Sequence, residues 1–167
     1  MPRDLDKIDL RILSELENDG RLSIVDLAMR VNLTNTPCSE RVKRLEKSGY
    51  INGYRALLNK NQLGFSHLTV VQVSLAATGD SSLDQFSEAV RSIQEVESCM
   101  LIAGSFDYLL MIRTRDIAHF RDILGDKINK LPGIHQTNSF AVMEVVKENQ
   151  NYNSICLLYT SPSPRDS

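Results

Sequence analysis

The spacing of apolar residues changes along this chain, and that change limits the folds it can adopt. Up to about residue 50, apolar residues recur every three or four positions, which places them on one face of a helix. From His67 onward, Val71, Val73 and Leu75 alternate with polar residues, which is typical of a strand with one buried face. The sequence therefore predicts an α+β chain whose N-terminal part is helical and whose C-terminal part contains a sheet.

Three short helices are expected in the N-terminal part. The first covers residues 4 to 19, with Asp4 or Asp6 as its cap and Gly20 closing it. The second starts after Ser23 and the third after Thr34. Between them Asn32 tolerates the left-handed conformation that a sharp turn needs. The pair is typical of a helix-turn-helix, and the alternative is an ordinary helical hairpin whose charged side is solvated.

The third helix has the pattern of a DNA recognition helix. Cys38, Val42 and Leu45 fall on one face and are expected to be buried. Short hydrogen-bonding side chains come first and cations later, an order that places base edges against the first turns and phosphates against the rest. The candidate DNA-binding residues are Thr34, Asn35, Thr36, Ser39, Glu40, Arg41, Lys43, Arg44 and Lys47.

Charge is distributed unevenly along the chain. Residues 34–60 hold six Lys/Arg against two Asp/Glu, whereas residues 61–150 hold seven against eleven. Positive charge thus concentrates on and after one helix, as binding to double-stranded DNA requires. The net charge of −2 for the whole chain does not contradict this partner, because the local field matters more than the total.

Composition argues against several other classes of protein. No run of 18 apolar residues is long enough to cross a membrane. The three cysteines are too few and too widely spaced for a zinc cluster, and their odd number suits reduced thiols in a cytosol. We therefore expect a cytoplasmic protein with no membrane contact, no metal and no cofactor.

The second half of the chain is expected to have the order βαββαβ. Strands are predicted from residue 67, over 96–103, over 108–113 and over 139–146, and helices follow Ser82 and Asp116, the latter stopped by Pro132 and Gly133. This order describes a split βαβ sandwich with both helices on one face of an antiparallel sheet. Apolar residues also occur on the other face, for example Val70 and Met111, so we expect a second subunit to cover it as a homodimer.

The predicted domains are residues 1–52 for DNA binding, a linker strand and loop over 53–66, and the sandwich over 67–148. Asn52 and Gly53 suit a hairpin that would form a wing with Arg55 on the DNA backbone, and the alternative is a plain connecting strand. The tail 149–167 fits neither period, and we interpret it as disordered or foreign to the domain.

Three blocks, at 5–54, 104–116 and 131–147, together resemble the Lrp/AsnC family of leucine-responsive and feast/famine transcription regulators, and the run TPCSERVKRLE is specific. The resemblance implies a winged helix-turn-helix joined to a ferredoxin-like (RAM/ACT-like) βαββαβ domain that senses a ligand and dimerises. It further implies that dimers assemble into octamers or similar rings. An effector, usually an amino acid, binds at the contact between dimers in the family.

Carried over to this chain, the resemblance places an effector loop at residues 104–108 and response positions at Ile117 and in the strand that begins at Phe140. Asp107 is suited to accept the ammonium of an amino acid, and the alternative is a structural Asp that satisfies turn amides. The candidate effector-binding residues are Met100, Gly104, Ser105, Phe106, Asp107, Tyr108, Ile117, Phe140, Ala141 and Val142.

Three positions depart from the family pattern. Asn32 replaces the usual turn glycine, Asn35 a common proline and Ser105 a frequent aspartate. Asn35 bears on base preference and Ser105 on ligand identity, so neither the operator nor the effector can be copied from the family.

The leading hypothesis is a sequence-specific DNA-binding regulator whose DNA binding or assembly responds to a leucine-like amino acid. One alternative is an architectural protein that wraps DNA through phosphate contacts. Another is an enzyme similar to the sirohaem decarboxylases, but His67, His119 and His135 are scattered and no nucleophile-base pattern accompanies them. We therefore predict a protein that is not an enzyme.

Overall fold

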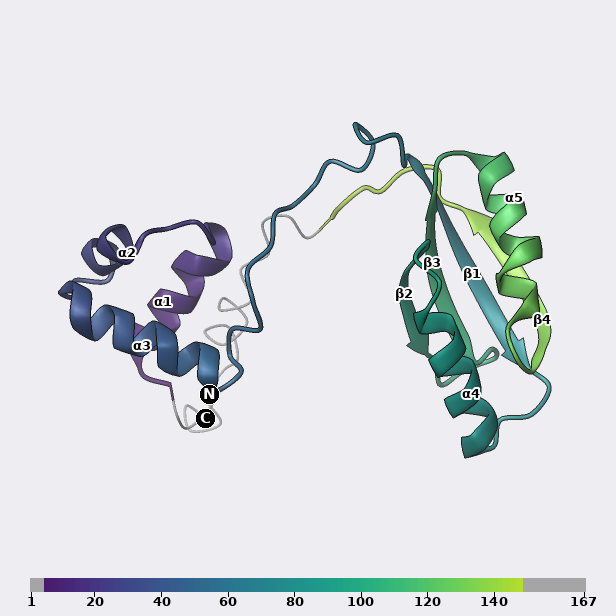
Figure 1. Cartoon of the computed structure of the whole chain (residues 1–167), viewed down its shortest axis with the longest axis horizontal. Helices are drawn as coiled ribbons and strands as arrows, with labels where there is room; N and C mark the ends of the chain where they lie inside the picture. Colours follow the sequence, from purple (N-terminus) through teal and green to yellow (C-terminus); the bar gives the residue numbers. More distant parts are fainter. Residues whose placement is uncertain (1–4, 149–167) are drawn as a thin grey trace, which may run out of the picture. The chain divides into compact units, whose positions relative to one another are not determined.

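The structure is a computed structural model that describes residues 5–148. Those residues form two compact units, one comprising residues 5–57 with 147–148 and the other running from Leu58 to Val146 (Figure 1). The point where they divide lies inside the segment 53–66 that the sequence assigns to a linker. Asp4, proposed as a helix cap, and the tail 149–167 lie outside the described residues.

Helices α1 (Lys7–Asn18), α2 (Ile24–Arg30) and α3 (Asn35–Lys47) make up the N-terminal unit. Their apolar faces enclose one small core, in which Leu10, Ile12, Leu27, Cys38 and Leu45 are at most 1% exposed. Burying each of the larger side chains contributes about 1.5–3 kcal/mol. The predicted buried face of the third helix is confirmed, so the opposite side of α3 is turned outward.

Local hydrogen bonds explain where these helices begin. The Asp6 carboxylate accepts the Asp9 amide N–H at 2.8 Å, and the Ser23 hydroxyl accepts that of Asp26 at 3.0 Å. Both predicted caps are confirmed, as is the left-handed turn at Asn32, whose φ is 57°. A cap was also predicted at Thr34, and this prediction is wrong: Thr34 directly precedes α3, but its side chain makes no capping hydrogen bond.

The prediction that glycine closes the first helix is wrong. Asp19 ends α1 in an extended conformation, with its own N–H donated to the Glu15 carbonyl. Gly20 therefore needs no left-handed φ and does not have one. Gly49 does close α3 with a φ of 80°, as a C-cap glycine should.

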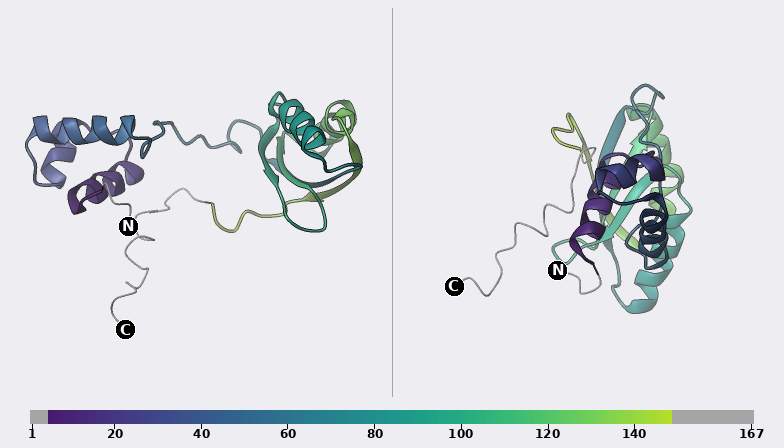
Figure 2. Two further views of the ribbon diagram at one scale, coloured as in Figure 1. Left: turned by 90° about the horizontal axis from the view of Figure 1, so that it is seen from below. Right: turned by 90° about the vertical axis from the view of Figure 1, so that its left-hand side faces the viewer.

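The C-terminal unit is a four-stranded antiparallel sheet with helices on one face (Figures 1 and 2). Its elements are β1 (His67–Leu75), α4 (Asp80–Arg91), β2 (Val96–Leu101), β3 (Tyr108–Thr114), α5 (Ile117–Asp126), the 3-10 turn η1 (Ile128–Lys130) and β4 (Ile134–Ala141). The strand order is β2-β3-β1-β4. The predicted order βαββαβ is confirmed.

The core of this unit lies between the sheet and the two helices. Val71, Val73, Phe86, Leu110 and Ile112 are fully buried there. Strands β1 and β3 supply the four aliphatic residues at alternate positions, as the period of two predicted, and α4 supplies Phe86. The remaining positions of the central strands point to the other side of the sheet, which no helix within residues 5–148 covers.

The last strand was predicted over 139–146, and this prediction is wrong in position. Strand β4 spans Ile134–Ala141 and pairs with β1 from Leu75 back to Thr69. Most of its side chains are exposed and polar, so main-chain hydrogen bonding to β1 defines it rather than alternating hydrophobicity. The preceding helix also stops early, at Asp126, and η1 continues it toward Pro132.

Residues 52–58 form an extended connection, which is the second of the two alternatives for this segment, and they form no hairpin at Asn52 and Gly53. Tyr54 holds this connection against the N-terminal unit, because its hydroxyl donates to Glu46 at 2.9 Å. Burial, together with the hydrogen bond and charge of Glu46, raises the pKa of Tyr54 to about 12. The extended connecting segment, rather than a wing, is what the structure shows over these residues.

Candidate nucleic-acid and effector sites

The candidate DNA-binding residues all lie on α3 or on its N-cap. Most of them are exposed, whereas Ser39 and Arg41 are half-buried. Lys43 and Lys47 lie on the exposed side of the helix, opposite Cys38, Val42 and Leu45. Neither lysine makes an ion pair with any residue from 5 to 148. No residue in the described range therefore offsets their charge.

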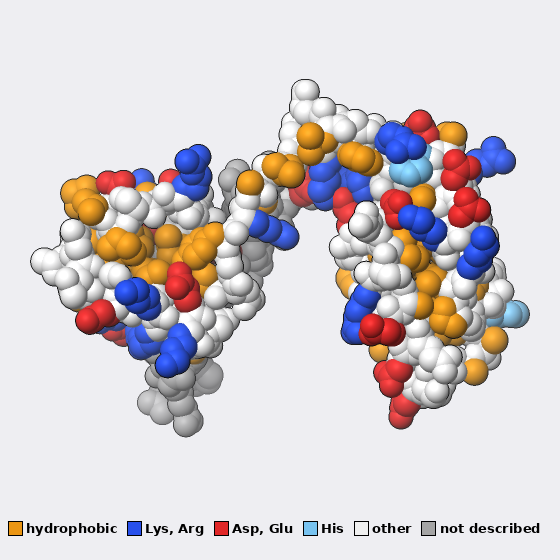
Figure 3. Space-filling model, viewed as in Figure 1, with side chains coloured by type: hydrophobic (Ala, Val, Ile, Leu, Met, Phe, Trp, Pro, Cys, Tyr) orange, Lys and Arg blue, Asp and Glu red, His pale blue; other side chains and the backbone are white. Residues whose placement is uncertain are grey.

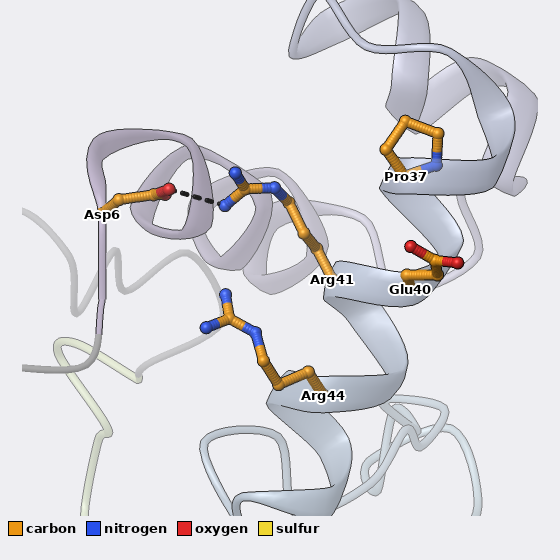
Figure 4. A pocket seen from close by; sticks show the side chains of 5 residues that line it. All are labelled: Asp6, Pro37, Glu40, Arg41 and Arg44. Carbon is orange, nitrogen blue, oxygen red and sulfur yellow. Dashed lines mark hydrogen bonds and ion pairs between the residues drawn. The ribbon is translucent and has the colours of Figure 1, made fainter.

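Arg41 and Arg44 are directed toward the start of α1 (Figure 4). The Asp9 carboxylate, 1% exposed, accepts from Arg41 Nη1 at 2.8 Å and from Arg44 Nη2 at 2.6 Å. Asp6, 53% exposed, accepts from the same Arg41 Nη1 at 2.7 Å. These four residues, which we call the acid-arginine cluster, fasten α3 to α1.

The cluster corrects the charge estimate made from the sequence. Two aspartates balance two arginines, so the charges of Arg41 and Arg44 are largely offset where they lie. The amide N–H of Asp9 and the guanidinium of Arg41 lower the pKa of Asp6, and Asp6 and Asp9 raise that of Arg41. A signal for this cluster was present in the sequence but was overlooked. Asp6 and Asp9 are three residues apart at the start of α1, and Arg41 and Arg44 are three residues apart in α3, so each pair lies on one side of its helix.

The histidines have ordinary structural partners. His67 Nε2 is 3.1 Å from the Thr69 hydroxyl, and its ring lies 6.2 Å from that of Phe120. His119 Nδ1 accepts the Arg115 N–H at 3.2 Å, while His135 is exposed. Over residues 5–148, no three His, Cys, Asp or Glu side chains come together as metal ligands would.

Among the described helices, none is both long enough and apolar enough to cross a bilayer.

Asp107 is bonded within the protein. Its carboxylate accepts the Leu75 N–H at 2.7 Å, its own N–H donates to the Val73 carbonyl, and its carbonyl accepts the Ile102 N–H. These bonds tie the loop between β2 and β3 to the end of β1. The geometry matches the structural alternative for Asp107, with one carboxylate oxygen committed to a backbone amide.

Tyr108 faces away from the predicted effector site. Its side chain is buried among the helices, stacks on Phe86 with ring centroids 4.4 Å apart, and places its hydroxyl 2.9 Å from that of Ser87. Tyr108 was predicted to bind the effector, but its side chain belongs to the core. A ligand at the loop could reach only its backbone.

The remaining effector candidates divide into two groups within one chain. The first, called the loop group, lies where β2 and β3 meet, near Leu75, and comprises Met100, Gly104, Ser105, Phe106 and Asp107. The second, called the strand-end group, lies near the start of β1 and comprises Ile117, Phe140, Ala141 and Val142. Along β1, Leu75, which bonds Asp107, and Thr69, which pairs with Ala141, are six residues apart, about 20 Å at ~3.3 Å per residue. Met100 is at the level of Gln72, nearer to that of Phe140, but the two lie on opposite edge strands of the sheet. One chain therefore does not bring the two groups together.

Comparisons with known proteins agree with this two-part design. The sequence profile of the Lrp/AsnC ligand-binding domain matches residues 68–152, and that of a winged helix-turn-helix DNA-binding domain matches residues 5–52. The proline dehydrogenase transcriptional activator of Rhizobium radiobacter is 50% identical over 87% of this chain and 93% of its own. The leucine-responsive regulatory protein of Escherichia coli K12 is 46% identical over 87% and 89%.

Solved structures show the same fold. A Neisseria meningitidis transcriptional regulator in complex with L-methionine superimposes with a TM-score of 0.81 at 33% identity, covering 86% of this chain and 93% of that one. An AsnC family regulator from Agrobacterium tumefaciens gives a TM-score of 0.82 at 32% identity, covering 86% and 94%.

The fold and the matched domains define a transcriptional regulator with a DNA-binding helix-turn-helix and a separate ligand-binding domain. Within that class, the chain belongs to the Lrp/AsnC family.

Proposed function

We propose that this protein is a sequence-specific regulator that inserts α3 into the major groove of duplex DNA. The observation that carries the proposal is the outward face of α3, where Lys43 and Lys47 are exposed and unpaired within residues 5–148. Thr36 and Ser39 nearer the helix start offer hydroxyls to base edges, and the two lysines offer charge to phosphates. DNA lies in the cytoplasm of bacteria, and we place the protein there.

We further propose that the uncovered face of the sheet pairs two copies. Val70 and Met111 are direct neighbours across β1 and β3 at the middle of this face, and Leu109 lies beside them. Arg113, two positions along β3 from Met111, pairs with Glu97 at 3.0 Å, and the same carboxylate also pairs with Lys60. An apolar centre of this kind is self-complementary about a two-fold axis, which also suits two α3 helices on a palindromic site. Association of dimers into octamers or similar rings remains a prediction from the family resemblance.

For the effector, we propose an aliphatic amino acid bound between copies. The loop group and the strand-end group lie at opposite ends of the sheet, so a site using both needs each from a different chain. Met100, Ile117 and Phe140 are exposed apolar side chains that could contact an aliphatic group. The complex of the Neisseria meningitidis relative with L-methionine supports a ligand of this class.

Selection of duplexes from a random-sequence pool at fixed salt tests the DNA-binding proposal. We expect enrichment of a site with two related halves arranged by a two-fold axis. Enrichment without any sequence preference would favour the architectural alternative, and no retention of duplex at low salt would contradict both.

Addition of single amino acids to the selected complex tests the effector proposal. An aliphatic amino acid should change the affinity for DNA by about 5- to 150-fold, which corresponds to the usual coupling of ~1–3 kcal/mol. Glycine, which lacks an aliphatic side chain, is the matched control. If none of the amino acids changes either the affinity or the size of the assembly, the effector proposal fails.

A further inference from the structure

The Asp6–Arg41 pair is the accessible half of the acid-arginine cluster. Asp9 is 1% exposed and holds both arginines, whereas Asp6 is 53% exposed and bonds only one of them. Asp6 and Arg41 are bonded to each other and line a surface pocket together with Pro37, Glu40 and Arg44 (Figure 4). An ion pair in this position can be exchanged for another anion without exposing a buried charge.

The contact resembles one that DNA would make. An Asp6 carboxylate oxygen lies 2.7 Å from Arg41 Nη1, a distance typical of a guanidinium bound to a phosphate oxygen. Arg41 is on the same helix as the proposed DNA-contacting lysines, but it lies two positions from Lys43 and so on another side of α3, the side next to α1. A phosphate approaching this flank of α3 would therefore compete with Asp6 for Arg41.

The acidic side chains around α3 reduce the attraction of this part of the protein for a polyanion. Glu40 adds a third carboxylate beside the pocket. In the view of Figure 3, basic and acidic side chains of the N-terminal unit are interspersed and form no patch of one sign. The pocket itself would therefore attract a polyanion weakly.

We propose that Asp6 is a specificity-determining residue, whose carboxylate takes the place on Arg41 that a backbone phosphate would otherwise take. The inference rests on the proposed DNA-binding function. Binding that is independent of sequence consists mainly of phosphate contacts. Because Asp6 occupies Arg41, it removes one such contact and weakens this non-specific binding. Affinity for the specific DNA site depends less on Arg41, because contacts to the base edges also hold α3 in the groove there.

The substitution Asp6→Asn tests the inference. Asparagine caps a helix about as well as aspartate, so α1 should keep its start while the charge is removed. For each α3 in contact, we expect the affinity for random-sequence duplex to rise several-fold, to about 8-fold near 0.1 M salt. The dependence of log K on log salt should steepen by about 0.9 for each α3 in contact, the value for one added phosphate contact. The ratio of affinities for the selected site and for random duplex should fall.

Asp26→Asn is the matched control. It makes the same change of charge on an exposed residue of α2 in the same unit and should leave the salt dependence as in the wild type. Asp6→Ser, which also keeps a capping side chain, should repeat the effect of Asp6→Asn, and thermal unfolding checks that each variant is folded.

Two failures can be told apart. If the wild type binds duplex DNA and both Asp6 variants match Asp26→Asn in salt dependence and in affinity for random duplex, the inference about Asp6 is overturned and the proposed function stands. If the wild type binds no duplex even in dilute buffer, the proposed function is overturned and the inference falls with it.

Discussion

Single ion pairs join separate elements of the C-terminal unit. Lys127, at the end of α5, donates to both oxygens of Glu95, just before β2, at 2.8 and 2.9 Å. The hydrogen bond from Lys127 is the main cause that lowers the pKa of Glu95 below its ordinary value of 4.5, against the opposing effect of burial. This pair thus links the pH of the solution to the stability of the unit.

Replacing Glu95 by Gln tests this link. Since the pKa of Glu95 is lowered in the folded chain, its contribution is complete above pH 4.5 and is lost as the pH falls through the lowered value. We expect Glu95→Gln to reduce the free energy of unfolding by up to ~1 kcal/mol at pH 7, with little difference from wild type in acid. Urea unfolding followed by circular dichroism measures both.

Glu88→Gln is the control for the pH experiment. Glu88 pairs with Arg91 at 2.8 Å, but both side chains are more than 70% exposed, so breaking the pair should change the stability little at any pH. A constant difference between Glu95→Gln and wild type from pH 7 into acid would show that the carboxylate charge is not what stabilises the contact.

At the scale of helices and strands, sequence patterns succeeded where side-chain burial determines the element. Cys38, Val42 and Leu45 repeat at helical spacing and are buried, so both faces of α3 could be predicted. Strands β1 and β3 alternate because helices cover one of their faces. Their order and the position of the sheet therefore followed from the sequence.

The patterns failed where long-range pairing determines the element. Strand β4 follows the edge of β1 with mostly exposed side chains, and its alternation is too weak to locate it. The acid-arginine cluster was missed for a similar reason, since Asp9 and Arg44 lie 35 residues apart and meet only after α1 and α3 pack. The division of the candidate effector residues into two groups was likewise not predictable, because it depends on the register of β1 with β3 and β4.

At the scale of the whole molecule, the proposed function requires that two copies of the chain associate. Met111 lies between Val70 and Ser98 on the uncovered face of the sheet. Met111→Glu should give a folded monomer, because burying an unpaired carboxylate at a two-fold interface places two like charges together. Sedimentation of the variant measures the size of the assembly.

Met29→Glu is the matched control, because Met29 is 66% exposed on α2 in the other unit. It should assemble as the wild type does. A Met111→Glu protein that keeps the wild-type size would show that the uncovered face does not join two copies.

The salt dependence of DNA binding in wild type, Lys43→Ala and Lys130→Ala tests most directly whether α3 contacts the duplex. Lys43 lies on the exposed side of α3 and Lys130 on the surface of η1, so the two substitutions remove the same charge from different units. Lys43→Ala should weaken binding to every sequence and flatten log K against log salt by about 0.9 for each α3 in contact, with Lys130→Ala unchanged. A Lys43→Ala protein with the wild-type slope would contradict the placement of α3 on DNA.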